Sequence, residues 1–225
     1  MRIGSILETP VFYPYMSGYS NLELIAGIKG IDKKAIEPKL EIVGLLERRD
    51  SPYRTFSFGM KQRLAVAAAL LGDPEVLILD EPTNGLDPQG IAHIRDIITE
   101  VASRGITIIL ASHLLDEVQK VCSHVAVLKK GNVLFSGKVS EVLSVSDCIE
   151  MCAANPALLI NAIREHPDFK TYNEADGKVL VYFKGEPDPS DINKFLYGKG
   201  VILSHLSDRK RTLEQHFLEL LQENQ

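Results

Sequence analysis

The 225-residue sequence has no long apolar run, since its longest such stretch spans only residues 64–71. A membrane-spanning helix needs about 18 or more consecutive apolar residues, so the sequence predicts no such helix. The first residues carry one Arg and soon meet Glu8, which does not match the charged and apolar regions of a secretory signal peptide. We therefore expect a cytoplasmic protein.

Cysteine is also scarce. The three cysteines, Cys122, Cys148 and Cys152, form no Cys-x-x-Cys pair and no even set that would suggest a disulfide framework. This usage fits a reducing compartment and buried thiols with a structural role.

Clusters of basic residues are missing as well. Lys and Arg number 25 against 30 Asp and Glu, which gives a net charge of -5, and the basic residues occur only in short, scattered runs. Binding to a nucleic-acid backbone needs a basic patch or stripe, so we expect no nucleic-acid partner. A content of 45% hydrophobic and 24% charged residues excludes a disordered or collagen-like chain.

An α/β pattern occupies the sequence up to about residues 136–137. Its three apolar runs, at residues 76–79, 106–111 and 125–128, are partly β-branched. Such runs are typical of parallel strands that are covered on both faces. Apolar residues recur at helical spacing between the first two runs, and residues 114–121 fit a short helix before the third. A turn at residues 130–132 predicts a hairpin after the third run.

Helices are expected on either side of this pattern and in the tail. Residues 21–49 and 57–71 have helical apolar spacing. From residue 147 onward, strands and helices alternate on a smaller scale in the order βαββαβα, ending in an amphipathic helix at residues 212–221. The sequence thus predicts an α/β domain at residues 1–140 and a small α+β domain at residues 147–225.

Two adjacent carboxylates, Asp80 and Glu81, end the apolar run 76–79. The carboxyl edge of a parallel sheet is where α/β folds bind ligands. Successive strand residues point in opposite directions, so one carboxylate can hold Mg²⁺ while the next orients a water molecule. The structural alternative is a strand that simply ends in two solvated acids.

The surrounding residues favour the functional interpretation. Ser57 and the free N–H groups around Gly59 would form an anion site where a helix begins. A tight turn at residues 84–88 brings a third carboxylate, Asp87, and His113 ends the next strand on the same edge as Asp80. A lone histidine there is usually structural, but this one joins hydroxyl, amide and carboxylate groups suited to a nucleotide phosphate.

Together these residues resemble the ATP-binding subunits of ABC transporters, over residues 1 to about 140. Four motifs stand in the family's order: the signature motif at residues 57–60, the Walker B strand at 77–81, the D-loop at 85–87 and the switch histidine at 113. The resemblance implies a P-loop NTPase fold with a mostly parallel sheet and a helical subdomain. It also implies ATP and Mg²⁺ as ligands, and the following roles: catalysis by Glu81 and His113, metal binding by Asp80, and nucleotide binding by Ser57, Gly59, Met60, Asp87 and Glu8.

Several departures from the common motifs narrow the resemblance. Phe58 stands where most relatives have Gly, Met60 where they have Gln, and Glu8 at what looks like the Q-loop position. These residues are similar to the branch that exports bacitracin and other antibiotics. The implied function is an ATP-binding and ATP-hydrolysing subunit that energises such an exporter. The implied partners are transmembrane permease subunits and a second ATP-binding subunit, in a homodimer or a heterodimer, at the inner face of the cell membrane.

One expected motif is missing. ATPases of this type need G-x-x-x-x-G-K-[S/T], yet only Lys170 is followed by Ser or Thr, and Phe169 precedes it. The chain is therefore expected to be inactive alone, either as an N-terminally incomplete subunit or as a natural degenerate protein that lends only its signature half-site. The intact Asp80, Glu81 and His113 favour the first explanation.

Two rival functions accompany this prediction. One is a non-catalytic regulatory or interaction protein with a degenerate ABC domain. The other is an ATPase of the DNA-repair or chromosome type, which would have a long coiled-coil insertion and a basic surface; the sequence has neither.

Overall fold

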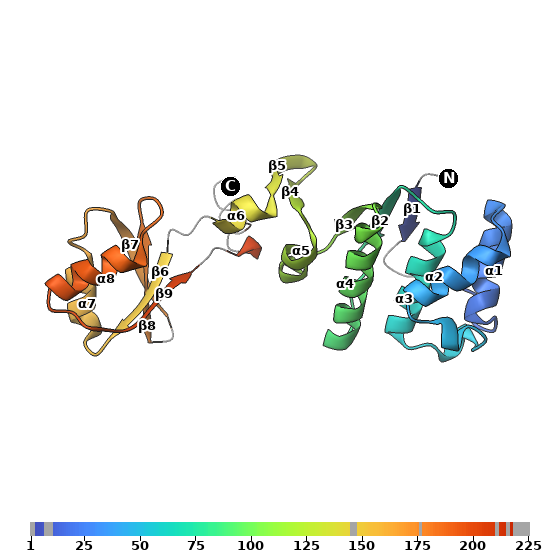
Figure 1. Ribbon diagram of the computed structural model, residues 1–225, viewed down its shortest axis with the longest axis horizontal. Helices are drawn as coiled ribbons and strands as arrows, with labels where there is room; N and C mark the ends of the chain where they lie inside the picture. The colour runs from blue at the N-terminus through green and yellow to red at the C-terminus, as the bar shows by residue number, and fades with distance from the viewer. Residues whose placement is uncertain are drawn as a thin grey trace. The chain divides into compact units, whose positions relative to one another are not determined.

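The computed structural model describes residues 3–6, 11–144, 148–175, 177–209, 212–214 and 217. The chain forms two compact units, Met1–Val121 and Cys122–Gln225, whose elements are labelled in Figure 1. The division after Val121 falls before the hairpin around residues 130–132, which the sequence assigned to the first domain. The domain limits 1–140 and 147–225 stay a prediction. No helix among the described residues is long and apolar enough to cross a membrane.

Unit 1 combines a three-stranded parallel sheet with helices that connect its strands. The sheet has the order β1-β2-β3, and Ile3, Val76 and Thr107 stand in register at its start. Its elements are β1 (Ile3–Ile6), α1 (Gly18–Lys29), η1 (Lys33–Ala35), α2 (Ile36–Ile42), η2 (Leu46–Arg48), η3 (Tyr53–Thr55), α3 (Phe58–Leu70), β2 (Val76–Asp80), α4 (Pro88–Ser103), β3 (Thr107–Ala111) and α5 (Leu115–Val121).

Helices cover only one face of this sheet. Both crossovers, β1-α3-β2 and β2-α4-β3, advance in the same direction, and right-handed crossovers of this kind place their helices on the same face. On the other face, Ile3, Ile78 and Ile109 are 50%, 36% and 54% exposed. The prediction that these strands are covered on both faces is therefore wrong within the described residues.

Close packing on the covered face depends on Gly4. A Cβ atom at Gly4 would lie 2.2 Å from the carbonyl oxygen of Ala69 in α3. Only glycine lets the β1 backbone approach α3 this closely. The main core of the unit, which includes Leu64, Leu77 and Ile94, lies between the helices and this face.

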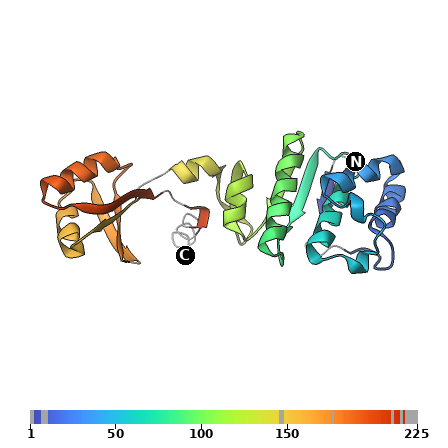
Figure 2. The same cartoon turned by 60° about the horizontal axis from the view of Figure 1, so that its bottom comes forward.

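The side chain of Asn21 links the start of α1 to the preceding residues by hydrogen bonds. This buried side chain accepts a hydrogen bond from the N–H of Tyr13 (2.8 Å) and donates to the carbonyls of Tyr13 (3.1 Å), Met16 (3.4 Å) and Ser17 (2.9 Å). Helices α1, α2 and α3 contact one another and form the helical group seen in Figures 1 and 2.

The third apolar run forms a strand, but its pairing differs from the prediction. β4 (His124–Lys129) pairs antiparallel with β5 (Asn132–Lys138), not in parallel with β3. Lys130 and Gly131 between them have φ values of 50° and 82°, the geometry of a type I′ turn, which folds β5 straight back onto β4. The predicted hairpin is thus confirmed. The prediction that residues 125–128 form a parallel strand is wrong among the described residues. Helix α6 (Val139–Ser144) follows.

The tail of unit 2 is an antiparallel sheet with two helices on one face. The sheet order is β7-β8-β6-β9, and α7 and α8 share a core with it through Ile149, Val181, Ile163 and Leu196. The elements are β6 (Cys148–Ala153), α7 (Pro156–Ile163), β7 (Phe169–Ala175), β8 (Lys178–Phe183), α8 (Pro189–Gly198) and β9 (Leu203–Arg209). This matches the predicted βαββαβ order; most of the predicted last helix lies outside the described residues.

Candidate functional site

Asp80 and Glu81 lie where β2 ends at the carboxyl edge of the parallel sheet. Asp80 is exposed and stands in register with Ala111 of β3. Glu81 donates its N–H to the carbonyl of Ala111 (2.9 Å) and has a φ of 44°, in the left-handed region that non-glycine residues seldom adopt. The side chain of Glu81 therefore leaves the backbone in a different direction from that of a residue in a continuing strand.

Glu81 and His113 form the central contact of the candidate site. Oε2 of Glu81 lies 2.8 Å from Nδ1 of His113, and the two side chains are 24% and 61% exposed. Because a carboxylate oxygen only accepts, the ring donates from Nδ1 and keeps Nε2 for a second partner. The prediction that His113 lies at the same sheet edge as Asp80 is confirmed, and the structure adds the contact with Glu81.

The residues at this edge suit water activation beside a phosphate. A carboxylate fixed by a histidine can accept a proton from, or orient, an attacking water molecule. The described residues contain no group of three or more His, Cys, Asp or Glu that could hold a metal ion by themselves. Magnesium commonly takes one or two protein carboxylates and completes its shell with phosphates and water, so the exposed Asp80 fits that smaller contribution.

The start of α3 forms the second part of the candidate site. Ser57 is the N-cap, and its Oγ accepts a hydrogen bond from the N–H of Met60 (3.2 Å). The N–H groups of Phe58 and Gly59 precede the first intrahelical bonds and point along the helix axis, as an anion site requires. The Met60 side chain packs partly against the core, so the ligand-binding group that this residue offers is its backbone.

A tight turn after β2 leads to Asp87 and the start of α4. The N–H of Asn84 donates to the carbonyl of Glu81 (3.1 Å), and that of Leu86 to the carbonyl of Thr83 (3.3 Å). Oδ1 of Asp87 accepts from the N–H of Gly90 (2.8 Å) and thereby caps α4. One carboxylate oxygen is thus occupied within the chain, and the other remains available for an outside contact.

Phe58 joins the signature motif to this turn. A Cβ atom at Gly85, whose φ is 73°, would lie 3.3 Å from the Phe58 ring, and one at Gly59 would lie 3.7 Å from Leu86. The aromatic ring therefore packs on the glycine of the turn. The sequence marked Phe58 only as a departure from the common motif, whereas the structure shows the contact that this side chain makes.

We expect Gly85→Ala to lower the free energy of unfolding by about 1–2 kcal/mol, because alanine disfavours a positive φ and its methyl group would press on Phe58. Gly105→Ala is the matched control, since Gly105 has a φ of 88° and nothing within 4 Å of its Cβ position. Urea unfolding followed by NMR resonances of unit 1 measures both. Equal losses in the two variants would show that the Phe58 contact adds nothing.

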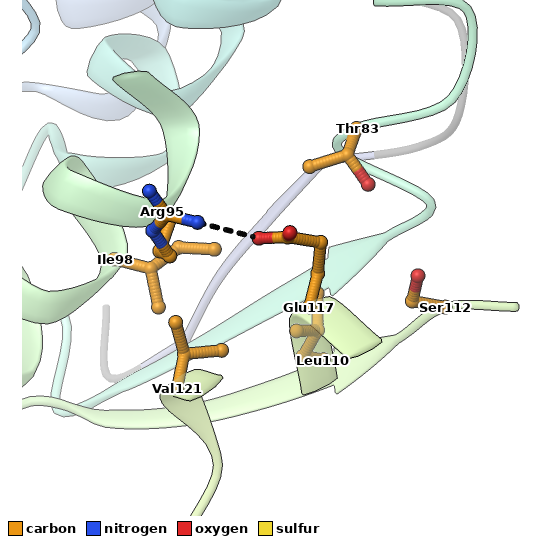
Figure 3. A pocket seen from close by; sticks show the side chains of 7 residues that line it. All are labelled: Thr83, Arg95, Ile98, Leu110, Ser112, Glu117 and Val121. Carbon is orange, nitrogen blue, oxygen red and sulfur yellow. Dashed lines mark hydrogen bonds and ion pairs between the residues drawn. The ribbon is translucent and has the colours of Figure 1, made fainter. Parts of the chain in front are cut away.

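A small pocket lies within unit 1 and is shown in Figure 3. Thr83, which is 7% exposed, and Ser112 contribute hydroxyl groups to its lining. Arg95 of α4 donates from Nη1 to Oε2 of Glu117 in α5 (3.1 Å), the contact drawn as a dashed line. Its remaining lining residues are apolar: Ile98, Leu110 and Val121. Nothing in the local sequence marks this ion pair.

An aromatic surface lies beside the helical group. It consists of Val11, Tyr13 and Tyr15, which are all largely exposed. The guanidinium of Arg54 lies 5.5 Å from the centre of the Tyr15 ring, a cation–π contact, and the backbone N–H of Arg54 donates to the carbonyl of Pro14 (2.9 Å). This surface is therefore held in shape by its neighbours and by Asn21.

The structure thus arranges the predicted site residues in two groups. Asp80, Glu81 and His113 gather at the strand ends, and the signature residues gather with the turn that contains Asp87. Among the described residues, no hydrogen bond or ion pair joins Ser57 or Gly59 to Glu81. Glu8 lies outside the described residues. The functional roles assigned to these side chains stay predictions.

Comparisons with known proteins give one matching family model and several relatives that are ATP-binding proteins of transport systems. A family model described as "AAA domain, putative AbiEii toxin, Type IV TA system" matches residues 14–117. The bacitracin transport ATP-binding protein BcrA of Enterococcus faecalis is 32% identical over 223 residues, which cover 98% of this chain and 72% of that protein. BcrA of Bacillus licheniformis is 35% identical over 98% of this chain and 73% of its own length. The lantibiotic transport ATP-binding protein SrtF of Streptococcus pyogenes is 42% identical over 133 residues, which cover 59% of this chain and 58% of SrtF.

Solved structures agree with these relatives. CbiO1 from Clostridium perfringens, described as part of the ABC transporter complex cbiONQ, superposes with a TM-score of 0.57 at 31% identity. The match covers 73% of this chain and 64% of CbiO1. A second structure, described as the ATP-binding subunit of an ABC transporter, has a TM-score of 0.54 at 31% identity and is covered over 60% of its length. The chain thus spans less than two thirds of either structure.

Proposed function

Since the chain belongs to the family of ABC transporter ATP-binding proteins, we propose that it serves as the ATP-hydrolysing subunit of an exporter for peptide antibiotics or related compounds. The relatives named for bacitracin and lantibiotic transport support this class of cargo. Hydrolysis would supply the free energy for export, and the permease would select the cargo.

The contact between Glu81 and His113 carries this proposal. It places a carboxylate at a sheet edge with an imidazole donor 2.8 Å away, beside the exposed Asp80. Glu81 would orient the attacking water and take up its proton, and His113 would keep the carboxylate in place. Catalysis by a positioned base contributes typically about 10²–10⁴-fold, which is large enough to detect in a single variant.

ATP and Mg²⁺ are the proposed ligands. Mg²⁺, when bound, would offset negative charge on the phosphates, with Asp80 as its protein ligand. The N–H groups of Phe58 and Gly59, together with the hydroxyl of Ser57, would bind the terminal phosphate of an ATP held by a second ATP-binding subunit. Asp87 would contact that subunit through the carboxylate oxygen that does not cap α4.

The proposed membrane partner is a permease with transmembrane helices. The aromatic surface of Val11, Tyr13 and Tyr15, next to the helical group, offers exposed apolar and aromatic side chains for an amphipathic segment of that permease. This contact would hold the chain at the inner face of the membrane.

The sequence contains no G-x-x-x-x-G-K-[S/T], so we propose that the 225-residue chain alone binds ATP too weakly to hydrolyse it. Calorimetric titration of the purified chain with Mg·ATP should then detect no binding. A dissociation constant in the micromolar range would contradict this part of the proposal.

The transport function itself is tested on the assembled complex. The chain is to be joined to a segment that carries G-x-x-x-x-G-K-[S/T], co-purified with a permease, reconstituted in vesicles, and assayed for ATP hydrolysis with bacitracin or a lantibiotic present. Hydrolysis that depends on the permease and rises with the peptide is expected. A complex that forms but hydrolyses no ATP would favour the second candidate, a non-catalytic regulatory subunit that contributes only its signature half-site.

A further inference from the structure

His113 lies on a short link between two elements, residues 112–114 between β3 and α5. The first end of the link is held by the sheet, because Ala111 accepts the N–H of Glu81. Its second end is the start of α5, where Oγ of Ser112 accepts from the N–H of Leu114 (3.1 Å). The position of the imidazole thus depends on where α5 begins.

Helix α5 cannot fix its own position. It runs only from Leu115 to Val121, and isolated helices of this length are unstable in water, so tertiary contacts must place it. One such contact is the buried Val118. Another is the hydrogen bond between Arg95 of α4 and Glu117, whose side chains are 32% and 19% exposed.

The Arg95–Glu117 ion pair ties α5 to a firmly packed helix. Arg95 follows Ile94, and Ile94, Ile97 and Ile98 bury α4 in the core of unit 1. Figure 3 shows the two side chains meeting from α4 and α5, in the pocket that Ser112 also lines. Hydrogen bonding to Lys120, and then the nearby charges of Lys120 and Arg95, lower the pKa of Glu117, which therefore stays ionised near neutral pH.

We propose that Arg95 and Glu117 are positioning residues that hold His113 within hydrogen-bonding distance of Glu81. This inference rests on the proposed function, because the pair matters for catalysis only if Glu81 and His113 act there. Arg95 and Glu117 would act through the link 112–114 and touch neither nucleotide nor water. Breaking their contact would let α5 shift and would move the imidazole away from the carboxylate.

The test uses the whole chain labelled with ¹⁵N-histidine, without nucleotide. The ring nitrogen resonances of His113 are identified by their loss in His113→Gln, and Glu81→Ala gives their position when the acceptor is gone. We expect Arg95→Met to move the Nδ1 resonance more than half of the way toward that position, and Arg95→Lys to restore most of the wild-type shift. Lys120→Met is the matched control, because Lys120 also contacts Glu117 (2.7 Å) but lies on α5 itself.

Each outcome separates the proposals. A wild-type His113 resonance in folded Arg95→Met, with a clear displacement in Glu81→Ala, would overturn the positioning role alone. No displacement in Glu81→Ala would contradict the Glu81–His113 contact and with it the observation behind the proposed function. Circular dichroism shows whether each variant folds. If Arg95→Met does not fold, Glu117→Gln, which preserves the shape of the side chain, is measured in its place and judged by the same displacement of the Nδ1 resonance. An equal displacement in Lys120→Met would also overturn the proposal, since that change leaves the link to α4 intact.

Discussion

Glu81→Gln in the permease complex is expected to lower the rate of ATP hydrolysis by about 100-fold or more. Glutamine keeps the size of the side chain and can still meet His113, but its amide cannot accept a proton from the attacking water. A loss of this size corresponds to about 2.7 kcal/mol of transition-state stabilisation. The steady-state rate of phosphate release, measured at saturating Mg·ATP, reports it directly.

The control for this variant is Glu100→Gln. Glu100 is an exposed carboxylate near the end of α4 that pairs with Arg104, far along the helix from Asp87. Exposed ion pairs of this kind contribute little, so the rate of ATP hydrolysis in Glu100→Gln should stay within about twofold of the wild-type rate.

His113→Ala should also hydrolyse ATP slowly. Combining it with Glu81→Gln should lower the rate little further, because the effects of residues that act as one unit are not additive. Hydrolysis at the wild-type rate in Glu81→Gln would exclude this carboxylate as the base.

Asn21→Ala should lower the free energy of unfolding of unit 1 by about 3 kcal/mol. The substitution removes the four hydrogen bonds of this buried amide. The N–H of Tyr13 loses its acceptor, whereas the carbonyls of Tyr13, Met16 and Ser17 each keep a backbone N–H donor. Buried polar groups that lose their partners keep the full cost of desolvation. Urea titration monitored by NMR resonances of unit 1 separates this loss from the unfolding of unit 2.

Glu23→Ala on the same helix is the control, because Glu23 makes only a surface ion pair with Lys33. Its cost should remain below about 1 kcal/mol. The loosened segment in Asn21→Ala should also weaken binding to the permease, since Tyr13 and Tyr15 belong to the aromatic surface. A loss below about 1 kcal/mol in Asn21→Ala would mean that water satisfies the freed groups and that Asn21 does not hold the segment.

The sequence predicted local structure well wherever a short pattern determines it. Ser57 before an Ala- and Leu-rich run correctly marked the start of α3, and the apolar run ending in Asp80 and Glu81 correctly marked β2. The placement of His113 at the same edge as Asp80 followed because parallel strands end at one edge of a sheet. These inferences depend on neighbours in sequence or on a general rule of topology.

Contacts between distant residues were not predictable in the same way. An apolar run such as that of β4 specifies a strand but not its partner, and the turn at Lys130 and Gly131 decided the pairing. Asn21, Arg95 and Glu117 are ordinary polar helix residues in the sequence, since nothing nearby shows that their partners lie on another segment. The exposed face of the parallel sheet was also missed, because β-branched runs occur whether helices cover one face or both.

The left-handed backbone of Glu81 has a consequence for how this position can change. A residue with a Cβ atom pays of the order of 1 kcal/mol to adopt a φ of 44°, which glycine adopts freely. Replacement by glycine would therefore relieve backbone strain while removing the carboxylate. Backbone strain alone would thus favour glycine here, and the contact of the glutamate side chain with His113 is what this replacement would lose. Engineering this chain for greater stability should accordingly leave position 81 unchanged.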